Sequence, residues 1–143
     1  MRQDNKRFRL NSRTYWCSWL LVVAVFLFAR YLVLVDTSDN LRFWVFNSYL
    51  LSLCILLLVF YFREGNRSFY YLEDNHPEIF QQVYGGKYFT PVFNSLRIYK
   101  FLHTKDVYGD PNIPILKSNG VTLYRLTLVS FFTCPIMFLL YMF

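Results

Sequence analysis

Residues 43–62 read FWVFNSYLLSLCILLLVFYF, a run of 20 residues without a charged side chain. An α-helix rises about 1.5 Å per residue, so this run would be about 30 Å long, which matches the hydrocarbon core of a bilayer. Backbone amides cannot reach water there, and a helix pairs them all within one segment. The run therefore predicts a transmembrane helix.

Two further apolar runs have the same character. The first covers residues 15–35, with Arg30 as its one charge, and the third covers residues 126–143 within a span segment that we place at 121–143. The chain is 55% hydrophobic and 22% aromatic, which is typical of a membrane protein rather than a soluble domain. The sequence predicts an all-α membrane protein with three transmembrane helices in a single integral membrane domain, residues 1–143. The first run lacks a small-x-small cleavage site, so we expect it to be retained.

The basic residues are concentrated on one side of these runs. Only Arg42 lies in the connection between the first and second runs. Because cytoplasmic segments carry an excess of Lys and Arg, we expect residues 1–14 and 63–120 to be cytoplasmic and the C-terminus to be external or periplasmic. Five basic residues precede the first run and seven lie within residues 63–120, namely Arg2, Lys6, Arg7, Arg9 and Arg13, then Arg63, Arg67, Lys87, Arg97, Lys100, Lys105 and Lys117.

Four polar side chains within the spans are candidates for helix packing or partner binding. In lipid, Asn47, Ser48 and Ser52 need hydrogen-bond partners, either on neighbouring helices or on the backbone of their own helix. Arg30 lies near the end of its run, where it can extend to the headgroups or act inside the membrane. Arg30 and Asn47 would also be the pore candidates if several copies formed a channel.

Residues 63–120 are too apolar to be a solvated linker, and two short helices are predicted there. The first should begin near Pro77, with Asn75 as its N-cap, and end at Gly85–Gly86. The second should run from Pro91 to about His103, with Thr90 as its N-cap. Residues 109–114 contain two prolines and predict a loop that leads into the third span.

The second of these helices is predicted to be amphipathic and to lie on the membrane surface or against the spans. Basic side chains near anionic lipid are favourable, so Arg97, Lys100 and Lys105 are candidates for membrane-surface binding. Its predicted apolar side comprises Val92, Phe93, Leu96, Tyr99 and Leu102, and its predicted polar side comprises Asn94, Arg97, Lys100 and Thr104.

Part of this region resembles the universal stress protein B family of small bacterial inner-membrane proteins. The resemblance covers about residues 54–100, and the spacing of its motifs from the second span is similar. It implies a bacterial inner-membrane location and a stress-linked role, and it brings no catalytic residue. The shared residues are Cys54-Ile55, Tyr61-Phe62, Pro77, Phe80-Gln81, Val83, the stretch Gly85-Gly86-Lys87-Tyr88-Phe89-Thr90, and Arg97.

The sequence contains no motif that predicts an enzyme. Gly85–Gly86 lacks the context of a phosphate-binding loop, and the serines lack a nucleophile elbow. We expect no cofactor, no metal and no nucleic-acid partner. The one cluster weighed against this expectation combines His76 and His103 with nearby acidic residues, namely Glu73, Asp74, Asp106 and Asp110.

These features favour a binding role over a catalytic one. The sequence predicts an interaction or regulatory protein of the inner membrane, with membrane lipids and either another membrane protein or a second copy of itself as partners. Two alternatives stay open at this point: an accessory subunit of a larger inner-membrane complex, and an immunity-type protein against a pore-forming toxin, which rests on similar architecture alone.

Overall fold

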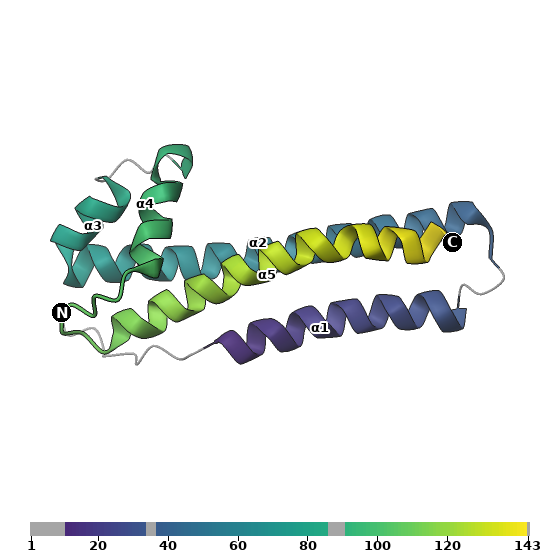
Figure 1. Ribbon diagram of the computed structural model, residues 1–143, viewed down its shortest axis with the longest axis horizontal. Coiled ribbons are helices and arrows are strands. Elements are labelled where there is room, and N and C mark those ends of the chain that lie inside the picture. The colour runs from purple at the N-terminus through teal and green to yellow at the C-terminus, as the bar shows by residue number, and fades with distance from the viewer. Residues whose placement is uncertain (1–10, 34–36, 86–90, 143) are drawn as a thin grey trace. The chain divides into compact units, whose positions relative to one another are not determined.

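The computed structural model describes residues 11–33, 37–85 and 91–142, and every regular element among them is helical (Figure 1). The all-α class predicted from the sequence is thereby confirmed. The elements are α1 (Ser12–Phe28), the π-helical turn η1 (Ala29–Val33), α2 (Asp39–Asn75), α3 (Pro77–Tyr84), α4 (Pro91–His103) and α5 (Asn112–Met142).

Three helical segments are long and apolar enough to cross a membrane, by length and composition. They are Ser12–Leu32, Asp39–Asn75 and Asn112–Met142, which confirms the three predicted membrane helices. The second and third helices extend well beyond the apolar runs, because charged and polar residues after Phe62 and before Leu126 continue the same helices.

The chain forms two compact units. We call residues Ser12–Tyr61 and Thr122–Phe143 the span unit, and residues Met1–Asn11 and Phe62–Val121 the connecting unit. Both α2 and α5 contribute one part to each unit, so the connecting unit is joined to the spans through two continuous helices.

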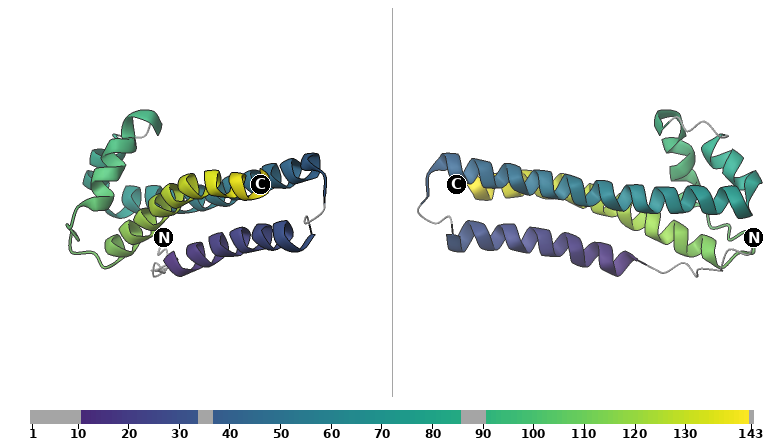
Figure 2. Two further views of the ribbon diagram at one scale, coloured as in Figure 1. Left: turned by 45° about the vertical axis from the view of Figure 1, so that its right-hand side comes forward. Right: turned by 180° about the vertical axis from the view of Figure 1, so that it is seen from behind.

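The span unit has an aromatic interior. In it, α1 runs alongside the first part of α2 and the last part of α5 (Figures 1 and 2). The rings of Tyr15 and Phe60 lie 4.5 Å apart between centroids, and those of Phe26 and Tyr49 lie 5.3 Å apart. Large rings fill the space between helices with few rotatable bonds, which explains the high aromatic content. The buried members are Tyr15, Trp19, Phe46, Tyr49, Leu53, Phe60, Leu123, Leu126, Met137 and Tyr141.

The connecting unit has its own apolar core between α3, α4 and parts of α2 and α5. Tyr84 is buried at the end of α3, and this burial raises its pKa to about 12, so the phenol stays protonated at any physiological pH. The buried core residues are Leu72, Ile79, Phe80, Val83, Tyr84, Phe101, Ile113 and Leu116.

Both predicted short helices are present, with one correction at a cap. The N-cap of α3 is His76, and Asn75 is instead the last residue of α2, where its Nδ2 donates to the carbonyl oxygen of Tyr71 at 3.0 Å. Gly85 ends α3 in the left-handed conformation with φ of 70°, which glycine adopts without strain. Pro91 is the first residue of α4, as predicted, and the predicted Thr90 cap lies outside the described residues.

The predicted loop over residues 109–114 is wrong in its second half, because α5 already begins at Asn112. Pro114 therefore lies in the first turn of a helix. The first four amide groups of a helix have no partner within it, so a proline there removes no hydrogen bond. Pro111 precedes the helix, and the two prolines mark its start.

Candidate interaction surface

Helix α4 packs on one side and leaves the other exposed. Phe101 is buried, and Ile98 and Leu102 are half-buried. Leu96 and Tyr99, in contrast, are 72% and 43% exposed. Of the predicted apolar side, Leu102 packs against the core, Leu96 and Tyr99 are exposed, and the side chains of Val92 and Phe93 lie outside the described residues. Apolar residues occupy more than half of this helix's circumference, so their period alone does not determine which half is buried.

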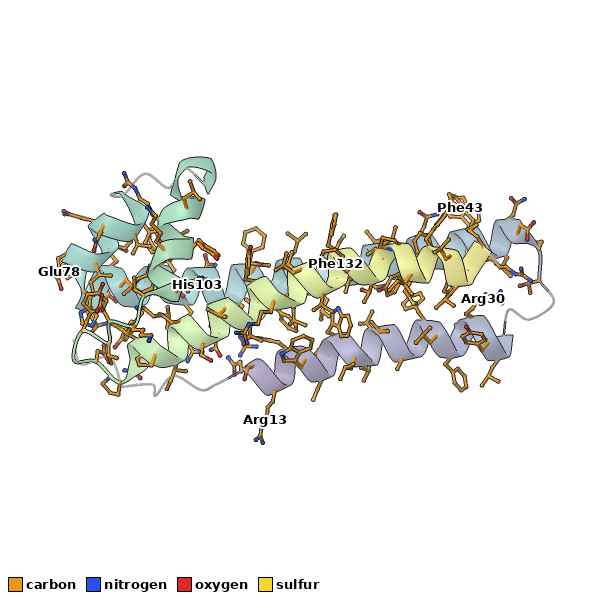
Figure 3. All side chains as sticks on the ribbon, in the orientation of Figure 1. Arg13, Arg30, Phe43, Glu78, His103 and Phe132 are labelled. Carbon is orange, nitrogen blue, oxygen red and sulfur yellow. The ribbon has the colours of Figure 1, made fainter. Side chains whose placement is uncertain are left out.

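We define the exposed α4 face by five exposed residues that combine apolar and basic character. The helix contains no acidic residue, so this face is positively charged. The rings of Tyr99 and His103 lie 4.2 Å apart, and His103 Nδ1 is 2.9 Å from the carbonyl oxygen of Tyr99. Arg97 and Lys100 are exposed, as the sequence predicted for the polar side. The face comprises Leu96, Arg97, Tyr99, Lys100 and His103, the last of which is labelled in Figure 3.

Leu102 of α4 approaches α5 closely at Gly120. A Cβ atom added to Gly120 would lie 2.6 Å from Cδ2 of Leu102, which is closer than real carbon contacts. Because glycine lacks that atom, Leu102 reaches the backbone of α5. Leu102 thus belongs to the packed side of α4, whereas Leu96 is exposed.

Lys117 ties the end of α4 to α5. Its side chain is only 7% exposed, and Nζ donates to the carbonyl oxygen of Thr104 at 3.1 Å, to Thr104 Oγ1 at 2.8 Å and to the carbonyl oxygen of Asp106 at 2.9 Å. The ammonium also lies 4.6 Å from the ring centroid of Phe101. A cation is favourable beside the carbonyl end of a helix. The sequence had placed Lys117 only among the orientation charges.

A second polar cluster joins the end of α2 to the start of α5. His76 Nε2 lies 2.8 Å from Asp110 Oδ2, which also accepts a hydrogen bond from the Tyr71 hydroxyl. Asp110 Oδ1 accepts from the backbone N–H of Asn112 at 2.9 Å, and Asn112 Nδ2 donates to the Tyr71 hydroxyl at 3.1 Å. Burial raises the pKa of the Asp110 carboxyl, but hydrogen bonds from Tyr71, Asn112 and His76 outweigh it and hold that pKa below its usual value.

The histidine and carboxylate cluster weighed from the sequence is thus brought together in part. His76 meets Asp110, and Glu78 Oε1 lies 3.9 Å from His76 Nδ1. His103 bonds its own helix instead. Within the described ranges, no group of three or more His, Cys, Asp or Glu side chains is arranged to hold a metal ion. The cluster joins helix ends, and its geometry is that of a structural contact.

A buried carboxylate in the connecting unit was missed by the sequence reasoning. Glu64 is 4% exposed and Asn119 is fully buried. Asn11 Nδ2 donates to Glu64 Oε1 at 2.9 Å, and the Asn11 backbone N–H donates to Asn119 Oδ1 at 2.9 Å. Arg67 lies one turn after Glu64, with 3.7 Å between Nη1 and Oε1. These contacts join residues that are far apart in the sequence, so no local sequence pattern predicts them.

The three polar candidates on α2 bond their own helix. Asn47 Nδ2 donates to the carbonyl oxygen of Phe43 at 2.9 Å. Ser48 Oγ donates to that of Trp44 at 3.0 Å, and Ser52 Oγ to that of Ser48 at 2.8 Å. Of the two arrangements that the sequence allowed, these bonds correspond to the one within the helix.

Arg30 lies in η1 and contacts α5. Its Nε donates to the carbonyl oxygen of Leu140 at 2.8 Å, and Figure 3 shows the side chain turned toward the last turns of α5. Leu140 belongs to the last four residues of α5, whose carbonyl groups lack partners within the helix. Arg30 thereby places a positive charge at the negative end of that helix.

No protein-family model, no curated protein and no solved structure matches this chain. The resemblance to the universal stress protein B family therefore stays a prediction.

Proposed function

We propose that the chain is a multi-pass protein of the bacterial inner membrane that acts as an interaction or regulatory protein, with the exposed α4 face as its contact surface. The observation that supports this proposal best is Leu96, which is 72% exposed on a helix whose other side is packed in a core. Large apolar side chains grouped on a surface favour association.

The composition of the exposed α4 face favours a protein partner with an acidic patch. Tyrosine and arginine are enriched among the residues that contribute most to protein–protein binding, and both are present here as Tyr99 and Arg97. Lys100 adds charge that would steer an acidic partner toward the face. Since the connecting unit is joined to membrane helices, we propose that the partner is itself a membrane protein.

Two further elements of the proposal rest on the sequence. The excess of basic residues before the first span and between the second and third supports a cytoplasmic N-terminus and connecting unit, with the C-terminus external or periplasmic. The family resemblance supports a stress-linked role for the interaction.

Photo-crosslinking in intact membranes tests the contact surface. A photoreactive phenylalanine analogue would replace Leu96, and in a matched control it would replace Tyr70, which is 62% exposed on α2 in the same unit. We expect residue 96 to crosslink to one membrane protein through a peptide rich in acidic residues, and residue 70 to give no such product.

Any other crosslinked product would contradict this proposal and indicate a different role for the exposed α4 face. Crosslinks from residue 96 to lipid alone would make the exposed α4 face a membrane-surface anchor, and crosslinks to a second copy would make the chain a homo-oligomer. Equal protein products from both positions would mean that α4 is not a specific contact. A fixed stoichiometry with one large complex would identify an accessory subunit.

A further inference from the structure

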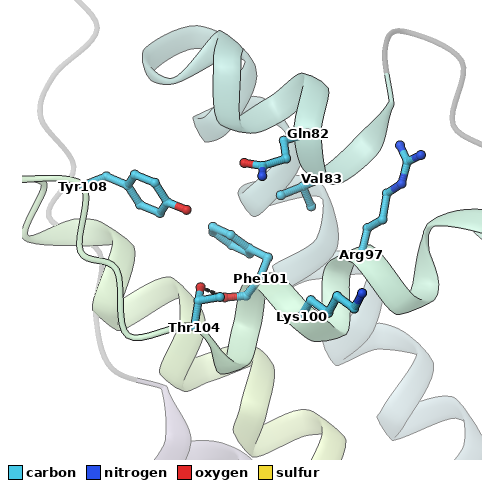
Figure 4. Close-up of a pocket in the computed structure, with 7 residues that line it drawn as sticks. All are labelled: Gln82, Val83, Arg97, Lys100, Phe101, Thr104 and Tyr108. Carbon is cyan, nitrogen blue, oxygen red and sulfur yellow. Dashed lines mark hydrogen bonds between the residues drawn. The ribbon is translucent and has the colours of Figure 1, made fainter.

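A groove in the connecting unit lies between α3, α4 and the segment that follows α4 (Figure 4). Its volume is about 500 Å³, within the range of small-molecule sites. Two of its lining residues, Val83 and Phe101, are buried core residues and form an apolar floor. The others are exposed and polar or aromatic: Gln82, Arg97, Lys100, Thr104 and Tyr108.

The groove is positively charged. Arg97 and Lys100 supply two cations, and the lining includes no acidic residue among the described part of the chain. Within the same part, neither cation forms an ion pair. Both therefore remain available to a ligand, unlike Arg67, which pairs with Glu64.

A third positive charge lies behind the lining. Lys117 Nζ is 4.6 Å from the ring centroid of Phe101 and 5.4 Å from that of Tyr108, and it donates to Thr104 Oγ1. All three of its N–H groups are accounted for by Thr104 and Asp106. Lys117 therefore attracts an anionic ligand through its charge and does not donate a hydrogen bond to it. The attraction between this positive charge and a bound anion is stronger beside a partly buried apolar floor than in open water, because the local dielectric constant is lower.

We infer that this groove binds a phosphate group attached to an apolar or aromatic body. Arginine matches phosphate with paired N–H groups, and lysine adds a point charge. The Gln82 amide and the Tyr108 hydroxyl are neutral donors on the same rim, and the floor of Val83 and Phe101 accepts the attached body. An anionic phospholipid headgroup and a phosphorylated small molecule share this chemistry.

The groove overlaps only in part with the exposed α4 face. Leu96 and Tyr99 do not line it, whereas Val83 and Thr104 do. Arg97 and Lys100 belong to both surfaces. The test therefore changes only these two cations, and it measures phosphate and lipid binding rather than partner capture.

The test uses the full chain in nanodiscs. In discs of phosphatidylcholine, phenyl phosphate would be titrated against the wild type, against Arg97→Gln with Lys100→Gln, and against Lys105→Gln as the control. Lys105 carries the same charge close by in the sequence but does not line the groove. In a second arm, discs of equal phosphatidylcholine and phosphatidylglycerol would be dissolved, and the lipid retained by each protein would be measured by native mass spectrometry.

We expect the double variant to lose about tenfold or more in affinity or retention, since it lacks two charge-assisted contacts, and Lys105→Gln to stay within about twofold of the wild type. Phenyl phosphate binding without lipid preference would identify a soluble ligand, and phosphatidylglycerol retention that the double variant loses would identify a headgroup. An unchanged double variant, or an equal loss in Lys105→Gln, would overturn the assignment. Unaltered hydrogen exchange around Phe101 would establish that the double variant is folded.

Discussion

The two units hold their helices together by different means. In the span unit, aromatic rings fill the interior, and the hydrogen bonds between helices are single contacts, such as Trp19 Nε1 to Ser130 Oγ at 2.9 Å and the Tyr141 hydroxyl to the Phe26 carbonyl oxygen at 2.6 Å. In the connecting unit, groups of polar side chains close the helix ends, with Lys117 at the end of α4 and Asp110 at the start of α5.

The difference follows from what surrounds each backbone. A long helix in a membrane satisfies its own amides, so its neighbours have only to pack. Short helices have a larger share of unpaired terminal groups, because the first four N–H and last four C=O groups lack partners in every helix. The connecting unit contains α3 and α4, and its stability should depend more on individual polar residues.

The largest effect is expected from Lys117→Met in the connecting unit. The substitution keeps an unbranched side chain but removes the donor to the Thr104 and Asp106 carbonyl groups, and we expect a loss of about 2 to 4 kcal/mol in the free energy of unfolding of this unit. Hydrogen exchange of the α4 amides would measure it, with the exposed Lys105→Met as the matched control. Equal exchange rates in both variants would show that Lys117 does not stabilise this unit.

Asp110→Ala should have the next largest effect, because it leaves Tyr71, His76 and the Asn112 N–H without their shared acceptor. We expect a loss of about 1 to 3 kcal/mol, measured as faster exchange in the first turn of α5. Exchange that stays slow there would indicate that α5 begins without this carboxylate.

The same carboxylate predicts a pH dependence. The folded pKa of Asp110 is lower than its usual value of about 3.9, so its ionised form stabilises the fold. This stabilisation should be complete above about pH 4 and lost as the pH falls through the lowered pKa. Asp110→Asn should flatten the acid limb of a stability profile recorded between pH 2 and pH 7, and a limb that is unchanged in this variant would assign it to other carboxylates.

In the span unit, Trp19→Phe should reduce the free energy of unfolding by less than the two substitutions in the connecting unit. It removes the indole donor to Ser130 but keeps most of the ring, and single hydrogen bonds between membrane helices contribute roughly 0.5 to 1 kcal/mol. A double-mutant cycle with Ser130→Ala would isolate this term, and Trp44→Phe, at a residue that is 67% exposed, is the control. A coupling energy between Trp19 and Ser130 as large as the stability loss of Lys117→Met would contradict the proposed difference between the two units.

The smallest effect is expected from replacing Asn47 by Leu and Ser48 and Ser52 by Ala together. Since all three bond their own helix, stability should change by less than about 0.5 kcal/mol per site, and the oligomeric mass should stay the same. A change in the oligomeric mass would show that these side chains contact a partner within the membrane.

The features that depend on local sequence were predictable. The membrane helices follow from runs long enough to cross a bilayer, and Gly85 and Pro91 mark helix ends through backbone conformations that the chain itself imposes. The sequence does not predict the start of α5 correctly, because prolines disfavour a helix interior but are tolerated in its first turn.

The features that depend on tertiary contacts were not predictable. Leu102 packs against Gly120 of α5, and the sequence around a glycine does not indicate which side chain lies beside it. Glu64 and Asn119 are far apart in the chain, and a single buried carboxylate has no local pattern. Of the predicted membrane-surface residues, Arg97 and Lys100 line the groove, and only the fold distinguishes them from Lys105.

We propose that the exposed α4 face binds another membrane protein. The most direct test of this proposal is the native mass of the tagged full chain after extraction in mild detergent, compared between the wild type and Leu96→Ser with Tyr99→Ser. We expect the wild type to leave the membrane with a second, different membrane protein, and the double variant to leave without it while still inserting. Equal masses for the two proteins would contradict the claim.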